Sequence, residues 1–192
     1  MIIVGLGHRK YTGKNTVASL IQKTICNTHP GVSVQIGSFA AKLKDICHQL
    51  YAWDGMKDAT HYEQYPNEKN MLLPIIGKTV RQIWIEMGTD AVRNHVYDLT
   101  WVKCALYPKP EPDVLLLPDL RFKNELKAIC DRDGIIVKVQ RDMIIETNDV
   151  ADVDLKDFVD WQFVIKNNGS IDDLKKDISF RCLMDRIYWR LK

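Results

Sequence analysis

Short apolar runs along the chain alternate with segments in which apolar residues recur every three or four positions. The short runs predict five strands, at 2–6, 32–36, 114–117, 135–139 and 163–165. The segments of helical period are at 16–26, 43–50, 80–87 and 124–130, and beyond residue 170. Strands that alternate with helices imply right-handed crossovers and a mainly parallel sheet, so the pattern predicts an α/β fold.

Short polar motifs predict where several helices begin and end. A Thr-x-x-Gln motif at 79–82 is a capping box, and a Ser-x-x-Asp motif at 170–173 opens the C-terminal helix. Gly88, followed by a threonine, predicts the end of one helix and the start of another. The segment 54–70 is polar and aromatic without a clean period, which predicts a mobile loop or a lobe of short helices.

The most specific chemical motif lies between the first predicted strand and the first predicted helix. From Gly7 the sequence is GHRKYTGKNT, and five residues separate Gly7 from Gly13 where the usual phosphate loop has four. Asn15 also stands where that pattern has Ser or Thr, with Thr16 next. Glycines at such a turn let backbone N–H groups point at phosphate oxygens, and Lys14 can reach the outer phosphates. The loop therefore predicts phosphate binding; the alternative is a glycine-rich turn with one exposed lysine.

Composition and charge limit which partners the protein can have. The 192 residues include 27 Lys and Arg against 25 Asp and Glu, a net charge of +2, and the basic residues form no block. A dedicated nucleic-acid-binding protein is usually more basic, so we expect no nucleic-acid polymer as a partner. The sequence has no apolar run of membrane-spanning length and no visible signal peptide, so we expect a cytoplasmic protein without a membrane partner.

The cysteines give a second indication of the compartment. Five cysteines are spread along the chain and form no Cys-x-x-Cys pair. An odd, scattered set predicts reduced and mostly buried thiols, and neither a disulfide framework nor a zinc site.

Further candidates for handling phosphate charge lie outside the loop. Arg81 and Arg93 fall on predicted helices, where an arginine can clamp a phosphate with two hydrogen bonds; from position alone, solvated surface arginines are the better interpretation. Asp119 follows a buried strand, where a carboxylate can face the ligand crevice of a parallel sheet, and Arg121 comes two residues later. A helix-capping role for Asp119 is an equally good interpretation. Trp84 can stack on a base, although tryptophans more often belong to the core.

Several segments resemble, in the same order, the deoxynucleoside monophosphate kinases of bacteriophages, a family of P-loop kinases. The phosphate loop ends in GKNT at 13–16, where that family commonly has GKDT. The other matches are FAAKLK at 39–44, GKTVRQ at 77–82, GT at 88–89, Arg93, WV at 101–102, DLRFKNE at 119–125 and NNG at 167–169, followed by Leu174.

The resemblance implies a fold and a division of the chain. It implies a three-layer α/β/α P-loop kinase with a mainly parallel five-stranded sheet. Residues 1–192 would form a single kinase domain. Within it, 53–100 would be the helical lobe that binds the acceptor monophosphate and 142–160 a short lid, entered from Arg141.

The resemblance also assigns roles to individual residues. The residues that would bind the phosphates of the donor triphosphate are Gly7, Thr12, Gly13, Lys14, Asn15 and Thr16. The residues that would bind the acceptor are Phe39, Lys44, Arg81, Trp84 and Arg93. The catalytic set is Lys14, Arg81, Asp119, Arg121 and Arg141. The adenine of the donor would lie beside Asn167, Asn168 and Gly169. Asn15 and Asp119 would hold Mg²⁺ directly or through water.

These observations predict an enzyme that transfers the γ-phosphoryl group of ATP to a deoxynucleoside 5′-monophosphate, with Mg²⁺ as cofactor and small-molecule nucleotides as partners. One alternative is another small-molecule P-loop kinase, such as one acting on dephospho-coenzyme A. A second is a nucleotide-binding protein without turnover. The sequence leaves open which base is accepted, and it leaves open a homodimer.

Overall fold

The computed structural model describes residues 1–142 and 154–192. The described chain forms two compact units. We call the first the sheet unit; it contains Met1–Ser38 and Pro108–Lys192. We call the second the helical unit; it contains Phe39–Tyr107, between the second and third strands of the sheet. The helical unit includes the segment 53–100 and extends beyond it at both ends.

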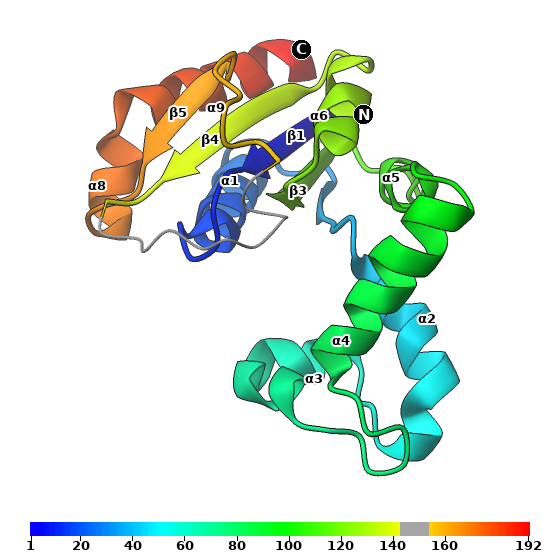
Figure 1. Cartoon of the computed structure of the whole chain (residues 1–192). Coiled ribbons are helices and arrows are strands. Elements are labelled where there is room, and N and C mark those ends of the chain that lie inside the picture. The colour runs from blue at the N-terminus through cyan, green and yellow to red at the C-terminus, as the bar shows by residue number, and fades with distance from the viewer. Residues whose placement is uncertain (143–153) are drawn as a thin grey trace. The chain divides into compact units, whose positions relative to one another are not determined.

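The sheet unit is built on five parallel strands (Figure 1). Their bounds are β1 (Ile2–Gly7), β2 (Val34–Ile36), β3 (Val114–Leu120), β4 (Ile135–Gln140) and β5 (Phe163–Lys166). The strand order across the sheet is β2-β3-β1-β4-β5, and every neighbouring pair is parallel. The α/β fold and the five-stranded parallel sheet predicted from the sequence are therefore confirmed.

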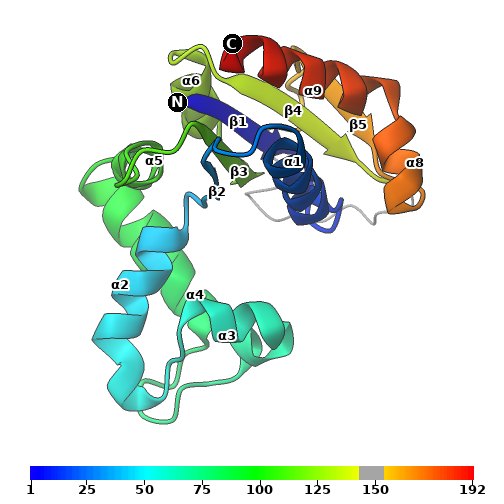
Figure 2. The ribbon, with the colours of Figure 1, turned by 180° about the vertical axis from the view of Figure 1, so that it is seen from behind.

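Helices cover both faces of this sheet. Three helices, α1 (Lys14–Thr28), α8 (Ile171–Lys176) and α9 (Ile178–Leu191), share one hydrophobic core with β1, β3, β4 and β5. Helix α6 (Lys123–Cys130) packs on the opposite face, where a Cβ atom on Gly5 would lie 2.5 Å from Ile129 Cδ1. Figure 2 shows α1 and α9 on the near side of the sheet and α6 behind it. The sheet unit is thus three layers deep.

The strand order creates a topological switch point at one end of the sheet. From β1 the chain runs through α1 on one face to reach β2, whereas from β3 it runs through α6 on the other face to reach β4. The connections after two neighbouring strands, β1 and β3, thus leave in opposite directions. In open parallel sheets this switch point forms the ligand crevice, beyond the carboxyl ends of the strands.

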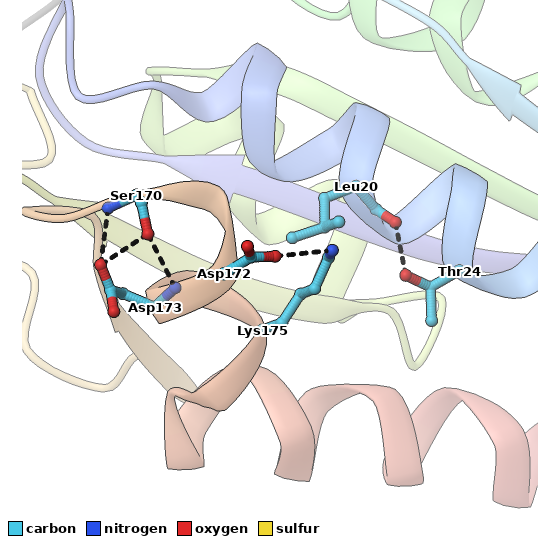
Figure 3. A network of polar contacts seen from close by, with 6 residues as sticks. All are labelled: Leu20, Thr24, Ser170, Asp172, Asp173 and Lys175. Carbon is cyan, nitrogen blue, oxygen red and sulfur yellow. Dashed lines mark hydrogen bonds and ion pairs between the residues drawn. The ribbon is translucent and has the colours of Figure 1, made fainter.

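The N-terminus of α8 has the cap predicted from its sequence (Figure 3). Ser170 Oγ accepts a hydrogen bond from Asp173 N at 3.2 Å, and Asp173 Oδ2 accepts one from Ser170 N at 2.9 Å. The hydrogen bonds from the side chain and the backbone of Ser170 lower the pKa of Asp173. This reciprocal pairing satisfies backbone donors that the first turn of a helix leaves unpaired, and so fixes where α8 begins.

The helical unit consists of short helices around a small core of its own. Their bounds are α2 (Ala41–Tyr51), η1 (Ala52–Asp54), α3 (Ala59–Gln64), η2 (Pro66–Asn70), α4 (Val80–Ile85), η3 (Glu86–Arg93) and α5 (Thr100–Leu106). The buried residues of this core are Leu43, Cys47, Met56, Tyr62, Leu73, Val80, Ile83 and Trp101. The interpretation of 54–70 as a lobe of short helices was correct, and the Thr-x-x-Gln motif forms the capping box at the start of α4.

The predicted helix break at Gly88 is wrong. The chain continues without interruption from α4 into η3, a π-helical stretch. Gly88 packs closely there, since a Cβ atom on it would lie 2.5 Å from Leu43 Cδ2 on α2 and would displace that side chain. Its carbonyl also accepts a hydrogen bond from Trp101 Nε1 at 2.8 Å. The glycine thus allows close packing of helices and does not end one.

The expectation that the cysteines are mostly buried is also wrong. All five are free thiols, as predicted, but only Cys47 is buried. The other four are exposed on helices whose buried positions are occupied by other residues. Among the described residues, no helix combines the length and apolar character required to span a membrane.

Candidate functional site

The loop between β1 and α1 has a backbone that few sequences allow. His8, Tyr11 and Gly13 have φ values of 92°, 62° and 87°, all in the left-handed region. Non-glycine residues adopt such values at a cost, and they do so most often at functional sites. Helix α1 then begins at Lys14, so its N-terminus faces the loop. A helix N-terminus preceded by such a loop favours anions.

The side chain of Lys14 lies inside the loop. It is 7% exposed, and its Nζ donates to the carbonyl of His8 at 3.0 Å and to the carbonyl of Arg9. Thr12 is 1% exposed, and its hydroxyl donates to the carbonyl of Arg9 at 3.1 Å. Lys14 is therefore not a solvated surface lysine, because carbonyl groups of the loop bind its ammonium group. Asn15 and Thr16 are exposed on the first turn of α1.

Asn167, which the resemblance places beside the adenine, is hydrogen-bonded to the loop between β1 and α1. Its Nδ2 donates to the carbonyl of Thr12 at 2.9 Å. A Cβ atom on Gly13 would lie 2.1 Å from that same nitrogen, so a larger residue here would displace the Asn167 side chain. The neighbouring Asn168 pairs twice with Asp142, through Asp142 N at 2.7 Å and Asp142 Oδ2 at 2.6 Å. The turn after β5 is therefore fastened both to the loop and to the end of β4.

Asp119 lies at the carboxyl end of β3, beside the phosphate loop. In the register of β1 with β3, Gly7 is opposite Leu120, so Asp119 reaches the same end of the sheet as the loop. Its Oδ2 accepts a hydrogen bond from Ser38 Oγ at 2.6 Å. Ser38 follows β2, and Gly37 N bonds to the carbonyl of Leu116 on β3, which fixes its position. Sequence reasoning missed Ser38, whose only signal was its place after a predicted strand.

The oxygens of Asp119 and Ser38 are of the kind that Mg²⁺ prefers. This ion is usually bound by one or two carboxylates together with substrate phosphates and water, and not by a cage of protein ligands. A half-buried carboxylate next to a phosphate loop fits that requirement. The helix-capping interpretation of Asp119 does not match the contacts, because Glu125 caps α6 instead. Glu125 Oε2 accepts from the backbone N–H groups of Arg121 at 2.9 Å and Phe122 at 3.1 Å.

Two further cations lie at this end of the sheet. Lys138 on β4 is in register with Gly7, and it is half-buried. Its pKa is lowered by burial first and then by the positive charge of Arg9. Sequence reasoning did not select either residue, because a lysine within a strand and an arginine within a loop carry no motif. Together with Lys14, they are three cationic side chains at this end of the sheet.

The predicted acceptor residues all lie in the helical unit, and the structure brings three of them together. Lys44 on α2 has its Nζ 5.3 Å from the ring centroid of Trp84 on α4. Arg81, one turn before Trp84, donates from Nε to Asn70 Oδ1 at 3.1 Å. Phe39 is 3% exposed, so its ring is buried. Arg93 lies further along, near the end of η3, and is half-buried.

For the remaining predicted site residues, the structure gives a position in the chain and a degree of exposure. Arg121 follows β3 and is half-buried, whereas Arg141 is exposed just after β4. Gly169 lies in the turn before α8. Most of the predicted lid, residues 143–153, lies outside the described residues.

A comparison with protein families identifies the group to which this fold and these residues belong. A family model described as "Deoxynucleotide monophosphate kinase" matches residues 34–178. The chain belongs to the deoxynucleotide monophosphate kinase family. The matched stretch starts at β2, so it includes the helical unit, Asp119 and Asn167. The phosphate loop precedes it, and evidence for that loop comes from its own residues and geometry.

A viral relative supports the same membership in the deoxynucleotide monophosphate kinase family. A protein of Acanthamoeba polyphaga mimivirus, named "Putative deoxynucleotide monophosphate kinase", is 23% identical over 193 residues. The similarity covers 93% of this chain and 94% of the viral protein. Family and relative together indicate a kinase of deoxynucleotide metabolism, as the sequence resemblance implied.

Proposed function

We propose that this protein transfers the γ-phosphoryl group of ATP to the 5′-phosphate of a deoxynucleoside monophosphate, with Mg²⁺, giving the deoxynucleoside diphosphate and ADP. The observation that carries the proposal is the phosphate loop at the switch point of the sheet, with Lys14 enclosed in it and Asp119 at the end of the next strand. The family supports a deoxynucleotide as the acceptor.

The donor side of this reaction needs charge neutralisation more than covalent chemistry. An oxygen of the acceptor phosphate attacks the γ-phosphorus, the bond from that phosphorus to the β,γ-bridging oxygen breaks, and ADP leaves with the electron pair. The transferred group carries its charge on three oxygens, so catalysis rests on positioning and on nearby cations. Lys14 exchanges its bonds to the loop carbonyls of His8 and Arg9 for bonds to the β- and γ-phosphates.

The loop backbone supplies the second part of this neutralisation. Residues with left-handed φ turn successive N–H groups toward the phosphates, and the N-terminus of α1 adds its partial positive charge. Asn167 keeps the loop in this shape through its bond to Thr12. Because these groups are fixed before ATP arrives, little reorganisation is needed in the transition state.

Asp119 and Ser38 complete the donor side of the proposal. The hydrogen bond from Ser38 orients the Asp119 carboxylate, which would hold Mg²⁺ directly or through water. When bound there, the ion would supply positive charge for the phosphate oxygens of the donor. Arg121, two residues beyond Asp119, adds a cation, and Arg81 and Arg93 in the helical unit bind the acceptor phosphate.

The experiment that tests the proposal measures ADP release from ATP and Mg²⁺ with a panel of acceptors. The panel contains the deoxynucleoside monophosphates, the ribonucleoside monophosphates and dephospho-coenzyme A. We expect turnover with at least one deoxynucleoside monophosphate. Turnover with dephospho-coenzyme A alone would show a different small-molecule kinase, and no turnover with any acceptor would indicate a nucleotide-binding protein.

A further inference from the structure

The ring of Trp84 in the helical unit lies under two lysines from different elements. Lys44 on α2 has its Nζ 5.3 Å from the ring centroid, and Lys69 on η2 has its Nζ 6.0 Å from it. Both distances are within the range of a cation–π interaction. Arg81 on α4 is held nearby through Asn70, the neighbour of Lys69. Three cations from three elements therefore converge around one tryptophan.

This convergence is electrostatically unfavourable unless an anion joins it. The pKa of Lys69 is lowered by burial first, and then by the positive charges of Lys44 and Arg81. Within residues 1–142 and 154–192, none of the three cations forms an ion pair. Glu63, the acid whose charge acts on Lys69, is exposed. Clusters of this kind are found where proteins bind anionic ligands.

The surroundings of Trp84 argue against a role in stacking on a base. The Tyr62 ring meets the Trp84 ring at 88°, with the centroids 5.6 Å apart, so the two rings pack edge to face. Trp84 Nε1 is buried and makes no hydrogen bond within the described chain. With tyrosine packed against it and two ammonium groups over it, the ring is a platform for cations.

We propose that Lys44, Lys69 and Arg81 bind the phosphate dianion of the acceptor, and that Trp84 positions the two lysines for it. This inference rests on the proposed function and adds to it. It names Lys69 as a binding residue, and it makes Trp84 a positioning residue. Arg81 grips two phosphate oxygens with its planar guanidinium group, while each lysine contributes a point charge.

The test compares Lys69→Met with a matched lysine in the same unit. Lys103 has its Nζ 5.8 Å from the Tyr107 ring, so Lys103→Met also removes a lysine that lies over an aromatic ring. We expect Lys69→Met to raise KM for the deoxynucleoside monophosphate about 10-fold or more, because a charge-assisted hydrogen bond is lost. KM for ATP and the KM values of Lys103→Met should stay within about 2-fold of the unaltered protein. Lys69→Arg should recover most of the affinity, because it keeps the charge.

A binding measurement without ATP separates this inference from the proposed reaction. Calorimetry with each deoxynucleoside monophosphate, and with the matching deoxynucleoside that has no phosphate, should show a loss in Lys69→Met for the monophosphate only. An equal loss for both ligands, no loss for either, or no binding of any monophosphate to the unaltered protein would overturn the inference. If the monophosphate-specific loss appears but no acceptor is phosphorylated, the proposed reaction fails and the anion site remains.

Discussion

The phosphate sites that we propose in the two units of this protein differ in the groups that would bind the phosphate. In the sheet unit the site is mostly backbone, since left-handed residues and a helix N-terminus surround a single enclosed lysine. In the helical unit the proposed site consists of side chains from separate short helices, since Lys44 and Lys69 lie over the Trp84 ring and Arg81 is bonded to Asn70, the neighbour of Lys69. A backbone site requires a contiguous sequence, whereas a side-chain site can be assembled from any elements that pack together.

The difference has consequences for how each site responds to substitution. The loop should be sensitive to changes that alter its backbone angles, because its donors are N–H groups. The cation cluster should be sensitive to charge and to side-chain shape, because its donors are ammonium and guanidinium groups. Substitutions in both units test this difference between backbone and side-chain donors.

The largest effect is expected from Lys14→Ala. Removing one preorganised cation from the transition state should lower kcat by roughly 10²–10³-fold. The fold should stay intact, because the sheet core does not include this side chain. Turnover assays and thermal unfolding check both statements, with Lys23→Ala, an exposed lysine on α1, as control. Near-normal turnover in folded Lys14→Ala would remove the loop from the reaction.

Substitutions of Arg81 should show whether acceptor binding depends on the charge of this side chain or on the planar shape of its guanidinium group. Arg81→Lys should raise KM for the acceptor nearly as much as Arg81→Ala, roughly 10-fold, because lysine keeps the charge but loses the planar fork. The control is Arg186→Lys on α9, whose guanidinium lies 5.2 Å from the Trp189 ring. If both Arg81 variants have unchanged kinetics and stability, Arg81 is a solvated surface residue.

Two glycine substitutions should distinguish backbone strain from steric conflict. Gly13 and Gly31 both have left-handed φ values, 87° and 112°, but only Gly13 has a neighbour that a Cβ atom would meet. Gly31→Ala should cost about 1–2 kcal/mol of stability from the left-handed conformation alone. Gly13→Ala should cost more and should also raise KM for ATP. Adding Asn167→Ala to Gly13→Ala should recover the part of the stability loss that comes from the steric conflict, but not the part that comes from the left-handed conformation. Chemical denaturation measures the stability of each variant. Equal losses for both glycines would show that Asn167 does not brace the loop.

The smallest effect on activity is expected from modifying the exposed thiols. Burial raises the pKa of Cys47 to about 11, whereas Cys104 in the same unit is exposed. At pH 8, a thiol reagent should modify Cys104 quickly and Cys47 only after unfolding. Because the pKa of Cys47 is raised in the folded state, its contribution to stability is present below pH 9.0 and is lost as pH rises through about 11. Rapid reaction of Cys47 in the folded protein would contradict the packing of the helical unit.

The sequence predicted the sheet unit better than the helical unit for a physical reason. Strands buried on both faces appear as apolar runs, and the phosphate loop is one contiguous motif, so both could be found without knowing what packs together. Lys69 and Ser38 could not be selected from the sequence because each contacts a partner distant in sequence, Trp84 for Lys69 and Asp119 for Ser38. Gly88 was misjudged because a glycine needed for close helix packing looks, in sequence, like one that ends a helix.

The most direct test of the proposed reaction identifies the product. Phosphorus NMR of the protein with ATP, Mg²⁺ and the acceptor found in the panel follows every phosphate at once. We expect the γ-phosphate resonance of ATP to be replaced by the β-phosphate resonance of the new deoxynucleoside diphosphate, with transfer roughly 10²–10³-fold slower in Lys14→Ala. Release of the γ-phosphate as inorganic phosphate while the monophosphate signal stays unchanged would contradict the proposed reaction.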